Sequence, residues 1–287
     1  MQLIGTVKEI WRYPVKSMAG ERMERATVGT MGIPGDRGWA IRDEKAGEIR
    51  NARKLPALLH CSAVYLREPS GSDMPPVQIT MPNGTTFQSD SAEAGAKLSE
   101  MLGRPVTIWP IQPASEHDFL KRAAPDNPDM MAELREVFGR LESEPLPDLS
   151  TLPPQILQFT SPFGTFFDAF PFQVLTTASL SELSRKNPAA DFDSRRFRPN
   201  VLIETKDGIE GLVEAEWSGR TIRIGETRIK LEMPTVRCVI PTLDQPGMKK
   251  DPSVLRTIVR DAAQNLGAYA TIATGGTIAL GDEVALE

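Results

Sequence analysis

Short runs of apolar residues, many of them alternating with polar ones, predict a chain built mainly from β-strands. Glycine, proline and asparagine turns separate the runs, and Pro82-Asn83-Gly84 between two of them is a hairpin signal. So many short strands with few helices indicate a mainly β (α+β) fold, with two β-barrel-like domains and peripheral helices. We expect strands at residues 4–11, 38–42, 63–66, 77–87, 106–111, 166–175, 200–204, 221–224, 227–233, 269–273 and 277–286.

Helices are predicted where apolar residues recur at helical spacing or where capping residues occur. One is expected from Asp90, as its N-cap, to Gly103 at its C-terminal end. A capping box predicts another from about Ser179. A third is expected at residues 253–266, with Gly267 just after it.

A proline-rich stretch, residues 113–155, divides the pattern into two halves. It contains seven prolines and one charged, helix-like piece at residues 130–141. Connections of this length are usually functional or mobile. We therefore divide the chain into an N-terminal β-barrel domain at 1–112, an irregular connection with a short helix at 113–155, and a second domain at 156–287.

Composition narrows the class of protein. The 287 residues are 40% apolar and 25% charged, with no apolar run long enough to span a membrane and no secretory layout at the N-terminus. Two cysteines cannot form a disulfide framework, so a cytoplasmic protein is expected. A net charge of −5 argues against general nucleic-acid binding, and two histidines offer little for a histidine metal site or a serine–histidine triad. We expect neither a nucleic-acid nor a membrane partner.

Cys238 is the candidate reactive residue. It follows Arg237, and a neighbouring guanidinium favours the thiolate, which ligates soft metals or attacks electrophiles. The alternative is a buried structural thiol, since free cysteine is often found in protein cores. Cys61 follows His60, but neighbours on a strand face opposite sides, so Cys61 is expected to be structural.

Four clusters of basic residues occur beside turn or strand-end signals. Arginine matches the oxygens of a phosphate with a planar fork, and lysine offers a point charge, so the clusters suit a phosphate-bearing ligand. The alternative is a set of solvated cations paired with surface carboxylates. Sequence alone does not bring the clusters together. They are residues 13–17, 35–37, 195–200 and 237–238.

These motifs resemble those of a known family. In the first half, YPVKSMAG at 13–20 and GIPGDRGWA at 32–40 resemble the N-terminal β-barrel of MOSC proteins, named after the C-terminal domain of molybdenum cofactor sulfurase. The second half is similar to the MOSC domain itself, and the resemblance covers almost the whole chain outside residues 113–155. The matching motifs there are FP at 170–171, RFRPN at 196–200, RCVIPTLD at 237–244 and GD at 281–282.

By architecture the chain is similar to the mitochondrial amidoxime-reducing components and their bacterial counterparts, which detoxify N-hydroxylated bases. The resemblance implies an oxidoreductase in which Cys238 ligates molybdenum at the catalytic centre. It also implies that the cofactor, molybdopterin, carries the redox chemistry while the protein binds and orients it. Carried over by motif, the implied cofactor contacts are Lys16, Ser17, Arg37, Arg198, Asn200 and Arg237, with looser matches at Thr177, Ser179 and Arg53.

The sequence departs from the family pattern in three ways. Pro241-Thr242 stands where two threonines are usual, and Asp244 is followed by Gln245 instead of proline. No cysteine cluster for a C-terminal iron–sulfur module follows. The electrons are therefore expected from a separate donor protein of iron–sulfur, flavin or haem type.

Three other functions fit the same residues. The protein could be a carrier or storage protein for the molybdenum cofactor without turnover. It could transfer sulfur through a persulfide on Cys238, or be a β-barrel interaction protein without a ligand.

Overall fold

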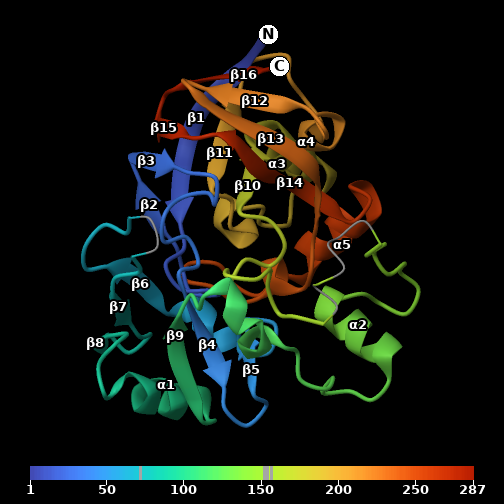
Figure 1. Cartoon of the computed structure of the whole chain (residues 1–287). Helices are drawn as coiled ribbons and strands as arrows, with labels where there is room; N and C mark the ends of the chain where they lie inside the picture. The colour runs from blue at the N-terminus through green and yellow to red at the C-terminus, as the bar shows by residue number, and fades with distance from the viewer. Residues whose placement is uncertain (71–72, 151–154, 156–157) are drawn as a thin grey trace.

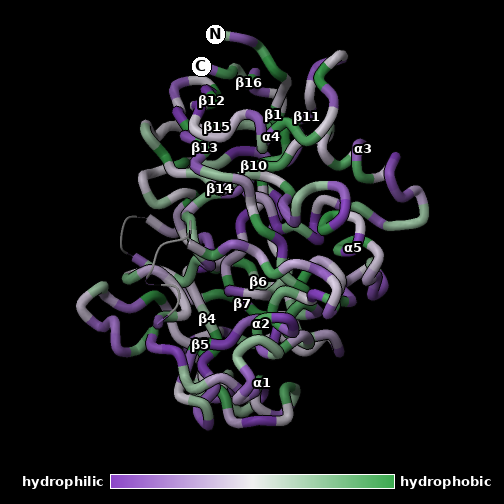
Figure 2. Tube along the Cα trace, turned by 90° about the vertical axis from the view of Figure 1, so that its right-hand side faces the viewer, coloured by the Kyte–Doolittle hydropathy of each residue, from purple (hydrophilic) through white to green (hydrophobic). Residues whose placement is uncertain are grey.

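The molecule has two lobes, which lie at opposite ends of its long axis (Figure 1). The structure is a computed structural model, and it describes residues 1–70, 73–150, 155 and 158–287. The barrel lobe holds both chain termini at its far end, and helix α1 of the small lobe lies at the opposite end in both views (Figures 1 and 2).

The barrel lobe is built around a closed ring of seven strands. Their order is β11-β10-β14-β13-β12-β16-β1, and pairing of β1 with β11 closes the ring. The predicted mainly β fold is confirmed. The seven strands are β1 (Gln2–Arg12), β10 (Phe172–Thr176), β11 (Val201–Thr205), β12 (Thr221–Ile224), β13 (Thr227–Val236), β14 (Asn265–Thr274) and β16 (Glu283–Leu286). In the barrel lobe, three short strands lie outside the ring: β2 (Glu21–Met23), β3 (Arg25–Val28) and β15 (Gly276–Ala279).

Alternating side chains fill the barrel as the sequence pattern predicts. On β12, Ile222 and Ile224 are fully buried, whereas Thr221 and Arg223 are half-exposed. Successive residues of a strand point to opposite faces, so one apolar face from each strand packs into a shared core. The burial of these branched side chains stabilises the closed ring.

Strand β1 joins the two halves of the sequence. It pairs antiparallel with β11 on one side and with β16 on the other. A strand from the first predicted domain therefore belongs to the barrel formed by the second. The predicted boundaries at residues 112 and 155 stay a prediction.

The small lobe contains two three-stranded sheets and its own hydrophobic core. The predicted hairpin is confirmed: Gly84 has φ 83°, and the amide of Met81 donates to the carbonyl of Thr85 at 2.9 Å. The sheets are β5-β4-β9 and β6-β7-β8. Their elements are β4 (Trp39–Asp43), β5 (Glu48–Arg50), β6 (Ser62–Tyr65), β7 (Val77–Thr80), β8 (Thr86–Gln88), β9 (Val106–Pro110) and α1 (Ala94–Leu102).

Helix ends differ from the sequence pattern at three points. Helix α1 begins four residues after Asp90, although Gly103 closes it with φ 66° as predicted. Helix α3 (Thr177–Lys186) is capped by the side chain of Thr176, so the predicted capping role of Ser179 is wrong. Helix α5 (Pro252–Asp261) ends before residue 266, because Leu266 and Gly267 already belong to β14.

The remaining helices are short. Helix α4 (Val213–Glu216) was not predicted. Among the described residues no helix is both long and apolar enough to cross a membrane. In the described part of the chain the 3₁₀ helices are Pro56–His60, Ala114–Leu120, Ser194–Phe197 and Ile240–Thr242.

The proline-rich connection is fixed to both lobes. Its helix α2 (Met130–Phe138) ends at Gly139, which has φ 61°, and so stops before the predicted Leu141. Asp126 pairs with Arg50 of the small lobe at 2.7 Å, and Glu144 pairs with Arg256 of the barrel lobe. The predicted connection includes residues 151–154, which lie outside the described residues.

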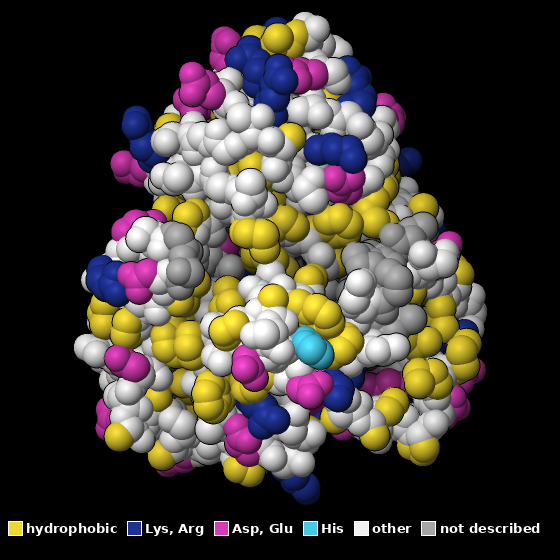
Figure 3. All heavy atoms as spheres, in the orientation of Figure 1, with side chains coloured by type: hydrophobic (Ala, Val, Ile, Leu, Met, Phe, Trp, Pro, Cys, Tyr) yellow, Lys and Arg dark blue, Asp and Glu magenta, His cyan; other side chains and the backbone are white. Residues whose placement is uncertain are grey.

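On the face shown in Figure 3, the surface is hollowed where the two lobes meet, and hydrophobic side chains border the hollow. The chain leaves β1 at Arg12 and runs on through this junction. Val15 forms a bridge with Trp39 of the small lobe, and the amide of Trp11 donates to the carbonyl of Asn200 in the barrel lobe at 2.8 Å. The motif at residues 13–20 is thereby held between the two lobes.

Candidate functional site

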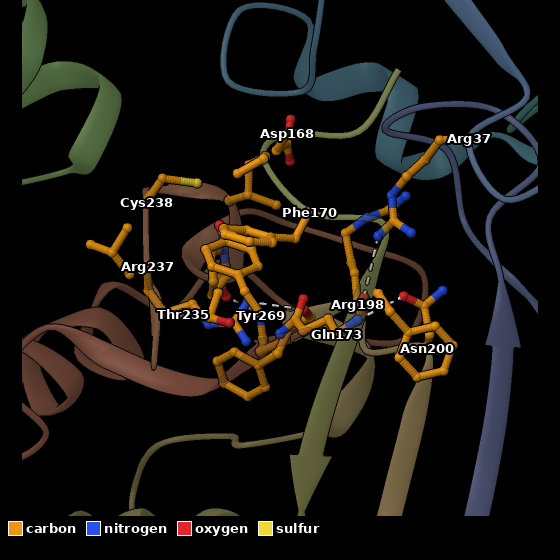
Figure 4. A pocket seen from close by; sticks show the side chains of 17 residues that line it. Arg37, Asp168, Phe170, Gln173, Arg198, Asn200, Thr235, Arg237, Cys238 and Tyr269 are labelled. Atoms are coloured by element: carbon orange, nitrogen blue, oxygen red, sulfur yellow. Dashed lines mark hydrogen bonds between the residues drawn. The ribbon is translucent and has the colours of Figure 1, made fainter. Parts of the chain in front are cut away.

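A pocket opens at this junction, with walls from segments far apart in the sequence (Figure 4). Arg37 precedes β4, the run 168–173 leads into β10, and Cys238 follows β13. The structure thus brings together basic clusters whose proximity the sequence did not reveal. Residues lining the pocket include Arg37, Asp168, Phe170, Gln173, Arg198, Asn200, Thr235, Arg237, Cys238 and Tyr269.

Arg37 and Arg198 share one aromatic ring as their platform. Their guanidinium carbons lie 4.8 Å and 4.2 Å from the ring centre of Tyr13. Tyr13 is buried, and its hydroxyl donates to the carbonyl of Pro199 at 3.1 Å. Because the face of an aromatic ring attracts cations, Tyr13 holds two like charges close together.

Three predicted ligand residues have a strained backbone. Ser17, Arg37 and Arg198 have φ values of 75°, 50° and 54°. Among the described non-glycine residues only Ala263 and Gln264 also have positive φ. The left-handed region costs an ordinary residue roughly 1–2 kcal/mol, and such strain is concentrated at functional sites.

Three buried polar atoms of the pocket-lining residues have no hydrogen-bond partner in the part of the chain described. One is Nε of Arg196, whose other guanidinium nitrogens bond to backbone carbonyls and Asp191; the other two are Nη2 of Arg198 and Oγ1 of Thr235. Burial lowers the pKa of Arg198 to about 10, and the nearby charge of Arg37 acts in the same direction. A buried donor without an acceptor costs stability, so Arg198 and Thr235 are suited to an anionic ligand.

Lys16 is held beside this pair of arginines by an acidic partner. Its ammonium donates to the carbonyl of Phe166 at 2.7 Å and to Oδ1 of Asp168 at 2.6 Å. Burial lowers the pKa of Lys16, while Asp168 opposes that change. Lys16 therefore already has two acceptors, and its predicted phosphate contact stays a prediction. Asp168 was not predicted from the sequence, because it has no pattern signal beyond its place two residues before Phe170-Pro171.

Arg237 forms part of the pocket wall, with its guanidinium bound to the backbone. It donates to the carbonyl of Leu266 at 2.8 Å and to that of Phe197 at 3.0 Å, and it lies 5.3 Å from the Phe197 ring centre. Burial lowers its pKa to about 10. These contacts fix the strand end that carries Cys238, and the predicted effect on the thiolate remains untested.

The connection contributes a second buried arginine beside Cys238. Arg140 donates to the carbonyl of Arg237 at 2.9 Å and to Oε1 of Gln264 at 2.9 Å. Burial lowers the pKa of Arg140 to about 10. The sequence analysis missed Arg140 because its partner is a backbone carbonyl that only the folded chain places beside it.

The two cysteines differ in their surroundings. Cys238 is partly exposed and lines the pocket, whereas Cys61 is fully buried. Cys61 packs in the hydrophobic core of the small lobe, as predicted for a structural thiol, and burial raises its pKa to about 11. No group of three or more histidine, cysteine or acidic side chains suited to a metal occurs in the described part of the chain. Cys238 is the pocket's thiol.

Ser17 and Asn200 have structural partners, and of the two only Asn200 lines the pocket. The hydroxyl oxygen of Ser17 accepts the amide of Ala52 at 2.9 Å. The amide group of Asn200 donates to Asp36 at 2.9 Å and accepts the backbone N–H of Gln173 at 3.0 Å. Asn200 joins the loop of Arg198 to that of Arg37, whereas Ser17 joins its own loop to Ala52.

The structure does not bring Thr177 and Ser179 into the pocket, so these two looser matches are corrected. The hydroxyl of Thr177 lies 3.1 Å from that of Thr205. Ser179 is fully buried and donates to the carboxylate of Glu214. Both belong to helix α3, where their hydroxyls bond to the polar side chains of Thr205 and Glu214.

Arg53 lies near the pocket without lining it. Its Nε donates to Oδ1 of Asn51 at 3.1 Å. Its positive charge nevertheless reaches Lys16 and Asp168 and lowers the pKa of each.

The fold and the site define the class of this protein. It is a mainly β protein of two lobes, with a cationic pocket and a thiol at their junction. Comparison with known families gives the particular one. The MOSC N-terminal beta barrel domain matches residues 4–111, and the MOSC domain matches residues 164–285. The chain belongs to the MOSC family.

Its relatives are distant. The chain is similar to mitochondrial amidoxime-reducing component 1 of Mus musculus, with 26% identity over 100% of this chain and 83% of that protein. It is similar to mitochondrial amidoxime reducing component 2 of Homo sapiens, with 27% identity over 85% of this chain and 68% of that protein. Human molybdenum cofactor sulfurase matches 92% of this chain at 21% identity, but only 29% of that protein is covered. Among solved structures, the YUAD protein of Bacillus subtilis aligns over 100% of this chain and 97% of that chain, with 11% identity and a TM-score of 0.46.

Proposed function

We propose that this protein binds the molybdenum cofactor and reduces N-hydroxylated compounds with electrons from a separate donor protein. The membership of the MOSC family supports the cofactor, and the names of the amidoxime-reducing relatives support the reaction. The observation that carries the proposal is the meeting of the Cys238 thiol with Arg37 and Arg198 in one pocket.

The residues present fit a ligand with an anionic end and a soft metal. Arg37, Arg198 and Thr235 would hold the anionic group, because the last two carry buried donors without an acceptor. Cys238 would be the metal ligand, since a thiolate suits a soft metal. Phe170 and Tyr269 stack with their ring centres 5.1 Å apart and offer a flat wall to a planar ring.

The proposed reaction is a two-electron reduction. The N–O bond of the substrate breaks, two electrons and two protons are taken up, and the oxygen leaves as water. The cofactor would supply the redox chemistry when bound, while the chain binds the ligands, orients them and limits water access. The electrons come from the donor protein, of iron–sulfur, flavin or haem type.

One observation favours the alternative of a cofactor carrier. Pro241 lines the pocket near Cys238, at a position where a threonine is usual in the family. Proline has neither a hydroxyl nor a backbone N–H to offer a ligand or substrate. A carrier would need the same anion contacts and no turnover.

The first test measures cofactor and turnover together. Protein purified from a host that makes the molybdenum cofactor is analysed for molybdenum and extractable pterin, then assayed with benzamidoxime and a reduced chemical electron donor. We expect Cys238→Ser to abolish reduction, because a hydroxyl is a much weaker ligand to a soft metal than a thiolate. Cys61→Ser is the matched control and should keep most of the turnover, since Cys61 is buried away from the pocket.

The outcomes separate the alternatives. Wild-type protein with stoichiometric molybdenum but no reduction supports the carrier function. Wild-type turnover in Cys238→Ser contradicts the ligand assignment. A persulfide on Cys238 without pterin favours sulfur transfer.

A further inference from the structure

The pocket is rich in hydrogen-bond donors and poor in acidic acceptors. Arginine and lysine side chains donate and cannot accept. Among the described lining residues, Asp168 is the only acidic one. A ligand that presents N–H or O–H groups to this pocket therefore finds its one charged acceptor at Asp168.

Asp168 is held in place while half of its carboxylate stays open. Oδ1 accepts the buried ammonium of Lys16 at 2.6 Å, and Lys16 is itself anchored on the carbonyl of Phe166 at 2.7 Å. The Asp168 side chain is 59% exposed, and no described residue donates a hydrogen bond to Oδ2. One oxygen is fixed by the protein, and the other has no donor among the described residues, in a side chain that lines the pocket.

The surrounding charges keep this carboxylate ionised. The surrounding pocket walls desolvate Asp168, which alone would raise its pKa, but the positive charges of Lys16, Arg53 and Arg37 outweigh this and hold the pKa below its usual range. Asp168 is therefore an acceptor, and not an acid, at neutral pH.

The close-up places Asp168 between the proposed metal ligand and one of the arginines. Cys238 lies on one side of it and Arg37 on the other, with the ring of Phe170 below (Figure 4). The stacked rings of Phe170 and Tyr269, inclined by 24°, give a flat surface next to the carboxylate. A flat group with N–H donors on one edge matches this combination of a ring face and an acceptor.

We propose that Asp168 is a specificity-determining residue, which binds the N–H edge of a planar N-hydroxylated amidine or guanidine through Oδ2. This inference rests on the proposed function. Loss of the hydroxyl turns a weakly basic N-hydroxyamidine into a strongly basic amidine, which takes up one further proton from water. The positive charge that results lies beside an ionised carboxylate, and such a group favours the charged product and the transition state leading to it.

The test measures ligand binding without turnover. Benzamidine and benzamide have the same shape, but only benzamidine is a cation at neutral pH. Calorimetric titration of purified wild-type protein should show tighter binding of benzamidine. In Asp168→Asn the affinity for benzamidine should fall about ten- to a hundredfold, the range expected for one charge-assisted bond, while benzamide binding stays unchanged.

Asp118→Asn is the matched control. Asp118 is an exposed carboxylate paired with Lys121 at 2.9 Å, and it does not line the pocket. This variant removes the same charge and should bind benzamidine like the wild type. The amide of Asp168→Asn can still accept from Lys16, and thermal unfolding together with pterin content identifies the folded, cofactor-bearing variant that is titrated.

Each result separates this inference from the proposed function. Equal affinities of the wild type for benzamidine and benzamide overturn the role of Asp168 without any variant. An unchanged benzamidine affinity and an unchanged KM for benzamidoxime in folded Asp168→Asn also overturn it, and leave the reductase function intact. A third outcome combines two results: Asp168→Asn loses the selectivity for benzamidine, and the wild-type protein reduces no N-hydroxylated compound. This outcome supports the carboxylate site and contradicts the proposed function.

Discussion

At the scale of residues, two arginines and one tyrosine determine how the pocket meets an anion. Arg37 and Arg198 repel each other, and Tyr13 offsets that repulsion by offering its ring to both. Arg198 still has one donor without a partner among the described residues. An anion would satisfy that donor and neutralise the pair, so Arg198 is expected to dominate anion binding.

Arg198→Ala should weaken cofactor retention without unfolding the protein. A charge-assisted bond to an anion is worth roughly 1.5–3 kcal/mol, which is about ten- to more than a hundredfold in affinity. The pterin content of the purified variant measures the effect. Arg195→Ala is the control, because Arg195 is exposed and paired with Asp193. Equal pterin content in Arg198→Ala and the control would falsify the assignment.

Tyr13→Leu should also lower cofactor retention, by about tenfold, because a desolvated cation–π contact is worth roughly 1–2 kcal/mol. Tyr13→Phe keeps the ring and loses only the hydrogen bond to Pro199, so it should retain most of the pterin. Pterin content is measured for both variants, with thermal unfolding as the folding control. If leucine and phenylalanine have the same effect, the ring is not the platform.

At the scale of elements, β1 decides whether the barrel closes. It pairs with β11 and β16, which both come from the other half of the sequence. Gly5 lies opposite Thr205 and Val284 in these pairings. A Cβ at Gly5 would overlap the carbonyl oxygen of Glu204, so the two strands approach closely only because this residue has no side chain.

Gly5→Ala should destabilise the fold by about 1–3 kcal/mol, the usual cost of overpacking a well-packed core. The free energy of unfolding in urea measures the effect. Gly29→Ala is the matched control, because its Cβ would meet only the carbonyl oxygen of Gly32, at 4.0 Å. Equal stability of the two variants would show that the strands can separate without loss.

At the scale of the whole molecule, the connection ties the two lobes together. Asp126 receives two hydrogen bonds from Arg50, at 2.7 Å and 2.9 Å, and also contacts Lys54. Chiefly because of the bonds from Arg50, the pKa of Asp126 is held well below its usual range. The ion pair of Asp126 therefore stabilises the fold fully above the pKa of about 4 that Asp126 has in the unfolded chain. This stabilisation is lost as the pH falls through the depressed pKa of the folded state.

Asp126→Asn should therefore loosen the connection at neutral pH. Trypsin should cut the variant faster than the wild type between residues 121 and 140, and the wild-type connection should become similarly labile to pepsin only under strongly acidic conditions. Asp148→Asn is the control, because Asp148 lies in the same connection and has no ion pair among the described residues. Cleavage at equal rates in Asp126→Asn and the wild type would mean that other contacts hold the connection.

Local pattern was enough to predict much of the fold. Most of the longer strands, the hairpin at Gly84 and the glycine at the end of α1 follow from short-range signals, because alternation and positive φ depend on neighbouring residues. The short strands β2, β3 and β5 were not predicted, and the strand expected at 166–175 begins only at Phe172. The end of α5 was predicted wrongly, since Leu266 fits a helical pattern equally well and only the barrel core requires it in a strand.

For the candidate site too, local sequence indicated some properties and only the folded chain revealed the others. Motifs in the sequence indicated Arg37, Arg198 and Cys238 as chemically suited to an anion and a soft metal, because these properties belong to the side chains themselves. Their meeting in one pocket depends on closure of the barrel and on the junction of the lobes, and no local pattern encodes that proximity. The folded chain likewise revealed Asp168, and it placed Thr177 outside the pocket, because long-range packing sets which polar groups face each other.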